Sequence, residues 1–130
     1  MKRFQLKQLI MEIVRTFLNE LGNEAQKFFW LDPDGKLRQV PRIGHWDWGF
    51  HYLTKIKHIP EEEAGKNVYG LMAQNGFFRV VLHTYMGKKI LQYDETNQYK
   101  PTARQRKSLS DYAIEFGADE VEAYNVERGT

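Results

Sequence analysis

The segment covering residues 77–93, FFRVVLHTYMGKKILQY, constrains the fold most because it describes a complete β-hairpin. Alternate residues in its first half would share one face of a strand: Phe78, Val80, Leu82 and Thr84. Met86-Gly87 lies where the chain has to turn. A hairpin with an apolar face needs a second layer to cover that face, so the segment predicts a sheet packed against helices.

A second hairpin is predicted from FFWLDPDGKLRQVP. Asp32-Pro33-Asp34-Gly35 has the composition of a type I turn, with Asp first, Pro second and Gly fourth. The flanking residues are apolar and aromatic, so we expect strands near 28–31 and 36–40.

Helical patterns separate and follow the two hairpins. We expect helices over residues 45–57, from Pro60 to Gly76, and from Thr102 to Gly117, where Thr102 and Gln105 have the spacing of a capping box. A short edge strand is expected at 120–126. The predicted fold class is α+β: a small single domain with two β-hairpins in an antiparallel sheet packed with about four helices.

The N-terminal segment 4–21 has the periodicity of an amphipathic helix that ends at Gly22. We therefore divide the chain into an N-terminal amphipathic helix, 1–22, and a compact α+β domain, 23–130. The apolar stripe must be covered either by the domain's own core or by another chain. The residues predicted to bind a partner are Leu6, Ile10, Ile13 and Phe17.

The stretch HWDWGFH, residues 45–51, has the richest collection of chemically versatile side chains. In a helix, Trp46, Phe50 and Leu53 would form a core stripe, continued from Ile43, while Asp47 and His51 would share the other side. His51 and His58 would be about 10 Å apart along the axis, too far to bind one ion. His45 would cap the helix or bond a backbone carbonyl. We interpret the stretch as structural and predict neither catalytic residues nor a metal site.

Basic residues crowd the start of the predicted last helix. These residues are Lys100, Arg104, Arg106 and Lys107. Cations are unfavourable at this end of a helix, so the concentration favours an anion such as a phosphate or a nucleic acid. Residues 108–130 hold six acids and one Arg, and ion pairs with this acidic tail are the alternative explanation.

Composition excludes several classes of protein. The 130 residues include no Cys, which rules out disulfides and thiolate metal sites. No apolar run approaches the ~20 residues of a membrane span, and charges interrupt the N-terminal segment, so neither a membrane protein nor a signal peptide is expected. The net charge of +2 is too small to indicate a nucleic-acid partner by itself.

Together these segments resemble a loose group of short, uncharacterised proteins encoded by bacteriophages and related viruses. That group has a leading amphipathic helix, a tryptophan strand with a Pro-x-Gly turn, a His-x-x-Trp helix and a Gln-containing last helix. His45 and Trp48 match the third feature and Gln105 matches the fourth. The group has no established activity, so the resemblance implies phage origin and an accessory or virion-associated role.

The expected function is therefore that of a non-enzymatic phage protein that works through contacts with other protein chains. Its partners would be virion components or further copies of itself, and it would be found in the virion or the host cytoplasm. No cofactor is expected. The alternative is a nucleic-acid-binding accessory protein that uses the basic start of the last helix.

Overall fold

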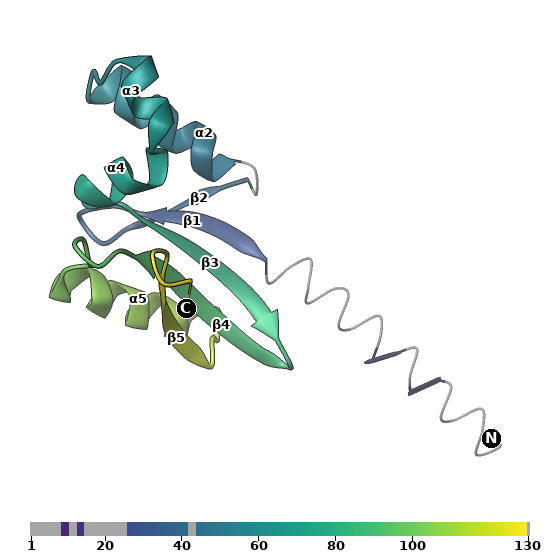
Figure 1. The fold of residues 1–130 in the computed structure, drawn as a ribbon. Coiled ribbons are helices and arrows are strands. Elements are labelled where there is room, and N and C mark those ends of the chain that lie inside the picture. Colours follow the sequence, from purple (N-terminus) through teal and green to yellow (C-terminus); the bar gives the residue numbers. More distant parts are fainter. Residues whose placement is uncertain (1–8, 11–12, 15–25, 42–43, 130) are drawn as a thin grey trace.

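The computed structural model describes residues 9–10, 13–14, 26–41 and 44–129. Five strands form one sheet in the order β2-β1-β3-β4-β5 (Figure 1). The strands are β1 (Lys27–Leu31), β2 (Leu37–Val40), β3 (Phe78–Tyr85), β4 (Lys88–Glu95) and β5 (Glu120–Asn125). The domain is small and mixes this mostly antiparallel sheet with four helices, in agreement with the predicted α+β class.

The turns form where the sequence predicts them. Between β1 and β2, the Gly35 N–H donates to the Asp32 carbonyl, and the Asp32 carboxylate accepts from the N–H groups of Asp34 and Lys36. Between β3 and β4, Met86 and Gly87 both have positive φ, +51° and +79°. Positive φ at both central residues is the geometry that matches the twist of a two-residue connection.

The last strand departs from the predicted antiparallel sheet. β5 pairs with β4 in parallel, with Leu91 opposite Val121 and Tyr93 opposite Ala123. Its predicted position in the sequence is right, but its direction was expected to continue the antiparallel pattern. The physical reason is the connection: α5 (Ala103–Phe116) leads the chain back along the sheet, so the next strand starts from the same end as β4.

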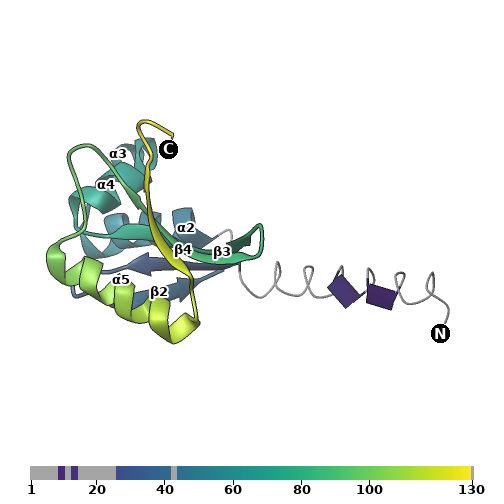
Figure 2. The same cartoon turned by 90° about the horizontal axis from the view of Figure 1, so that it is seen from below.

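α5 covers one face of the sheet, and the remaining helices lie against the other face (Figures 1 and 2). Leu109 and Ala113 of α5 pack on Leu31, Val80 and other residues of the strands. On the opposite face, Trp30 and Val40 pack on the second group of helices. That group consists of α2 (Gly44–His51), the π-helical turn η1 (Tyr52–Ile56) that continues it, α3 (Glu61–Lys66) and α4 (Val68–Gln74).

The caps of α5 confirm the prediction in detail. The Thr102 hydroxyl accepts from the Gln105 N–H, and the Gln105 side chain accepts from the Thr102 N–H. Gly117 ends the helix with a φ of +68°. The predicted single helix from Pro60 to Gly76 is instead two helices, because Asn67 leaves the helical region at φ −156° and caps α4 by accepting from the Gly70 N–H.

The predicted core stripe of the helix over 45–57 is confirmed at Leu53, which is fully buried, but it is wrong at Trp46. The buried positions are His45, Gly49 and Leu53, whereas the Trp46 side chain is 40% exposed and stacks on Phe50. Gly49 explains the difference, since a Cβ there would lie 2.8 Å from Val68 Cγ1. The helices therefore meet along the face that carries the glycine. Ile43, the first residue of the predicted stripe, lies outside the described residues.

Candidate functional site

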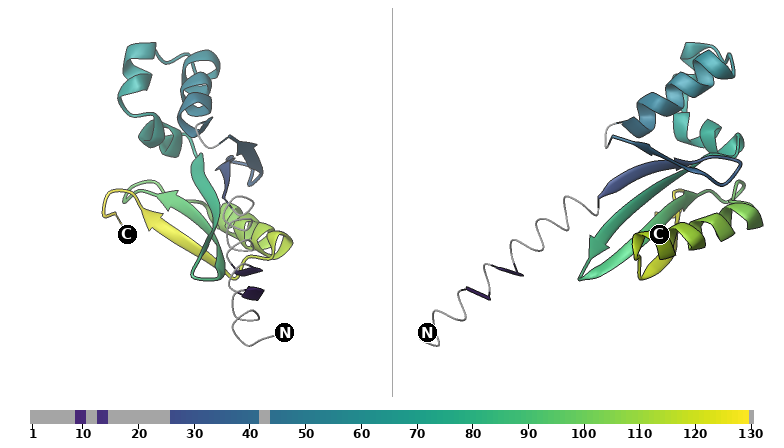
Figure 3. Two further views of the ribbon diagram at one scale, coloured as in Figure 1. Left: turned by 90° about the vertical axis from the view of Figure 1, so that its right-hand side faces the viewer. Right: turned by 180° about the vertical axis from the view of Figure 1, so that it is seen from behind.

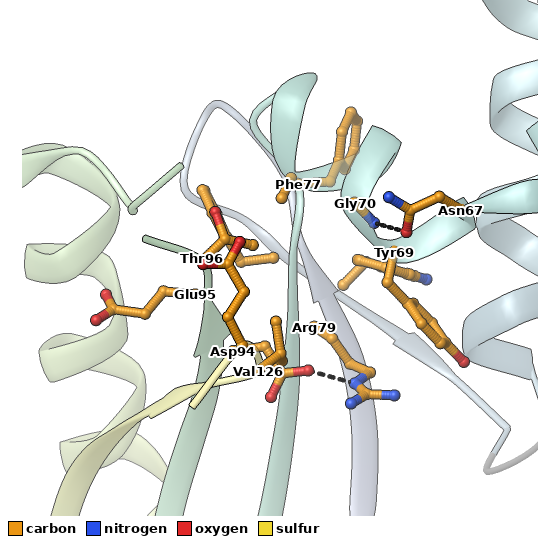
Figure 4. A pocket seen from close by; sticks show the side chains of 13 residues that line it. Asn67, Tyr69, Gly70, Phe77, Arg79, Asp94, Glu95, Thr96 and Val126 are labelled. Carbon is orange, nitrogen blue, oxygen red and sulfur yellow. Dashed lines mark hydrogen bonds and ion pairs between the residues drawn. The ribbon is translucent and has the colours of Figure 1, made fainter. Parts of the chain in front are cut away.

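A groove with two lobes is lined by residues of α2 and α4, of the sheet and of the C-terminal part of the chain. Figure 3 shows how these elements are arranged, and Figure 4 shows the side chains that line the first lobe. The first lobe has a volume of about 320 Å³ and the second about 450 Å³. Tyr69, Arg79 and Asp94 line both lobes, so the two lobes adjoin at this group. We call this feature the open-face groove.

Arg79 and Asp94 form an ion pair at the centre of the open-face groove. Arg79 Nε donates to Asp94 Oδ2 over 2.6 Å, and the Tyr69 ring lies against the guanidinium, with its centroid 4.5 Å from Cζ (Figure 4). Burial raises the pKa of the Asp94 carboxyl, while the Arg79 charge and hydrogen bond act to lower it. The guanidinium is therefore held by a carboxylate and an aromatic ring, two contacts that fix its orientation.

The two lobes have different linings. Apolar residues line the first lobe, among them Trp30 and Phe77, and its charged border consists of Glu95 and Glu127 together with the central ion pair. The second lobe lies against Trp46, Val81, Gln92 and Tyr124. Exposed aromatic surface next to hydrogen-bonding groups is typical of a binding site rather than of a solvated face.

His45 supports the wall of the second lobe. Its Nε2 lies 3.1 Å from the Phe29 carbonyl oxygen, and its own carbonyl accepts from Trp30 Nε1. Burial, helped by the Arg79 charge, lowers the pKa of His45 to about 4. The imidazole is neutral at pH 7, so Nε2 donates to the carbonyl. This bond confirms one of the two roles expected for His45.

The other polar residues of HWDWGFH do not join the groove. Asp47 and His51 are exposed on the outer side of α2. Within the described residues, no group of three His, Asp or Glu side chains could hold a metal ion. In the same part of the chain, no helix is both long and apolar enough to cross a membrane.

The predicted anion-binding residues lie along the start of α5, and three of them have local partners. Lys100 Nζ is 3.5 Å from Glu95 Oε1, Lys107 Nζ is 3.5 Å from Asp111 Oδ2, and Arg106 Nη1 donates to the Pro101 carbonyl over 2.7 Å. Arg104 is exposed. The acidic tail meets the basic segment elsewhere, where Lys88 pairs with Glu120 over 3.1 Å. Anion binding at this helix start stays a prediction.

The predicted partner-binding stripe is described only in part. Leu6 and Phe17 lie outside the described residues. Ile10 and Ile13 are in helical conformation, with 51% and 58% of their surface exposed. The described neighbours Leu9 and Val14 are also exposed.

Reasoning from the sequence missed the open-face groove, although a signal for its centre is present. Arg79 precedes Met86 by seven positions, and Asp94 follows Gly87 by seven. A two-residue turn places such residues opposite each other on the same face of the hairpin. In the structure β3 and β4 pair with Val80 opposite Tyr93, and the same register sets Arg79 opposite Asp94. Nothing comparable in the sequence places Tyr69 over the pair, because α4 is remote from the hairpin turn.

Comparison with known proteins gives no relative: no family model, curated protein or solved structure matches this chain.

Proposed function

We propose that this chain is a non-enzymatic phage accessory or virion-associated protein that acts through protein–protein contacts made by its N-terminal segment. The observation that carries the proposal is the exposure of Ile10 and Ile13 on helical backbone, 51% and 58%. Covering apolar surface of this kind stabilises an assembly by about 25 cal/mol per Å². The phage context comes from the resemblance alone.

The neighbouring positions strengthen the argument. Leu9 and Val14 expose 43% and 47% of their surface, so the described residues 9–10 and 13–14 all present large apolar side chains. A group of such side chains is typical of an interaction surface, whereas a single exposed leucine or isoleucine is common on any protein. The occupant would be a virion component or a second copy of this chain.

The test is native mass spectrometry of the natural chain and of the double variant I10D/I13D. We expect the natural chain to appear at multiples of 15.4 kDa or with additional protein chains. The double variant should appear at the monomer mass because a buried, unpaired carboxylate is very unfavourable in an interface. Its far-ultraviolet circular dichroism reports whether the sheet domain is retained.

The matched control is I114D. Ile114 is 80% exposed on α5, so this variant adds a charge to an exposed apolar position in another part of the molecule. It should assemble like the natural chain. A monomeric natural chain at micromolar concentration, without companions, would contradict the proposal. Co-purified nucleic acid would favour the basic start of α5 instead.

A further inference from the structure

We propose that the open-face groove binds an extended basic segment of a partner protein, with a Lys or Arg side chain in the first lobe and an apolar side chain in the second. The inference adds a second surface, and a partner chemistry, to the protein contacts of the proposed function, and it rests on that function. Its own evidence is the charge and the shape of the groove.

Charge indicates a cationic occupant. Among the residues that line either lobe, Arg79 is the single Lys or Arg, and its Nε is already committed to Asp94. Asp94 and Glu127 line the first lobe; Glu95 lines it too, but its side chain points away from Asp94 and Arg79 and meets Lys100 (Figure 4). His45, the remaining basic side chain of the second lobe, is neutral at pH 7 because burial lowers its pKa. An anionic ligand would meet an excess of negative charge.

The partners of these carboxylates leave room for another cation. Glu127 accepts one hydrogen bond, from the Asn97 N–H over 3.1 Å. Asp94 has a single ion-pair partner and is largely buried, so a second cation beside it would favour its charged form. The Tyr69 ring at the junction already contacts the Arg79 guanidinium, so the carboxylates provide the attraction for a second cation.

Shape indicates an extended chain. The lobes adjoin at Tyr69, Arg79 and Asp94, and both are lined by residues of α4, β3 and β4 and of the chain near the end of β5. Figure 4 shows the residues that line the first lobe. The second lobe offers Trp46 and Val81 to an apolar side chain. Gln92 lies beside them with an amide that can pair with a peptide backbone. A charged side chain and an apolar one on neighbouring residues match these two environments.

The experiment titrates full-length protein with three blocked peptides that differ at one position. Each contains glycine, then arginine, glutamine or glutamate, then phenylalanine, and binding is measured by calorimetry. Backbone amide shifts in the ¹⁵N-labelled chain locate the site. We expect the arginine peptide to bind about tenfold more tightly than the glutamine peptide, as a partly desolvated charge pair would give. The amide shifts should centre on Tyr69, Asp94 and Glu127.

Variants test the individual lobes. E127Q should remove most of the preference for arginine, and W46L should weaken all three peptides because it removes apolar surface from the second lobe. Glu127 and Trp46 are both exposed, so these changes spare the core. The controls are E120Q and Y85L, at positions that do not line either lobe. They should bind like the natural chain.

Several results would overturn the inference. These are equal or tighter binding of the glutamate peptide, absence of saturation by the arginine peptide at millimolar concentration, and amide shifts that map outside the groove. Saturable binding of adenosine or uridine at the same residues, without the peptide, would assign the groove to a small heterocycle instead. The variant I10D/I13D should still bind the peptide, and E127Q should still assemble, so the two proposals fail separately.

Discussion

At the scale of single residues, His45 couples stability to pH. Its pKa is about 4 in the folded protein, against 6.5 as the ordinary value, because burial and the Arg79 charge disfavour the imidazolium. Between these values the unfolded chain binds more protons than the folded one. The contribution of neutral His45 to stability is therefore complete above about pH 6.5 and is lost as the pH falls towards 4.

We expect the free energy of unfolding to decrease by about 2 kcal/mol from pH 7 to pH 5 through His45 alone. Asp94, whose pKa is raised, contributes with the opposite sign. Urea unfolding of the natural chain and of H45Q at both pH values isolates the histidine, since Gln can still donate to the Phe29 carbonyl. A natural chain with the same pH slope as H45Q would show that His45 titrates normally.

Gln105 has a structural role in addition to the one it has in the capping box. Its side chain is 1% exposed, and its Nε2 donates to the carbonyls of Asp32 and Gly76 over 2.9 and 2.8 Å. It thus ties α5 to both the β1–β2 turn and the start of β3. We expect Q105M to lower the free energy of unfolding by about 2–4 kcal/mol, because it leaves the Gly76 carbonyl and the Thr102 N–H without these partners and removes one of the two donors to the Asp32 carbonyl. S110A, on the exposed side of α5, is the control for denaturant unfolding and should change little.

These residues show which contacts can be predicted from the sequence and which cannot. The Thr102–Gln105 cap is local, so spacing alone predicts it. The bonds from Gln105 to Asp32 and Gly76 cross 73 and 29 positions of the chain, and no local pattern encodes them. Arg79–Asp94 is intermediate, because the hairpin turn fixes its register even though the residues are 15 positions apart.

At the scale of elements, two glycines in neighbouring helices should respond in opposite directions to the same change. A Cβ on Gly49 would lie 2.8 Å from Val68 Cγ1 and 3.2 Å from Met72 Cγ, where α2 packs on α4. A Cβ on Gly65 of α3 would meet only Phe50 Cε2, at 3.9 Å. We expect G49A to destabilise by about 1–3 kcal/mol and G65A to stabilise by about 0.5–1 kcal/mol. Thermal unfolding checks both, and stabilisation by G49A would show that the helices separate freely.

The same helix contact explains why the existence of elements was easier to predict than the faces they bury. Aromatic residues dominate HWDWGFH, so hydrophobicity alone assigned Trp46 to the core. The structure instead buries the small side of α2, because the close approach of α4 requires Gly49. Packing of this kind depends on shape as well as on polarity. The parallel direction of β5 was not predicted for a related reason. Strand propensity shows that a segment is extended, but it does not specify which strand it pairs with.

At the scale of the whole molecule, the residues of both buried clusters come from the same part of the chain. The cluster under α5 and the cluster under α2–α4 consist of residues between Phe28 and Ala118, and the sheet separates them. The parallel strand β5 follows α5 and closes one edge of the sheet. Among the residues that the structure describes, the members of both clusters all lie within the predicted domain 23–130.

This distribution predicts that residues 1–22 can be removed without unfolding the domain. We expect the shortened chain to unfold cooperatively, with a free energy within about 1 kcal/mol of the full chain, because no cluster member among the described residues is deleted. It should also lose the assemblies seen by native mass spectrometry, since the deletion removes Ile10 and Ile13. Calorimetry and amide spectra measure the first effect. If the shortened chain were unfolded, the N-terminal segment would belong to the core of its own domain and the exposed stripe would have no separate role. If it folded and still assembled, the contact surface would lie on the domain, and the open-face groove would be the next surface to test.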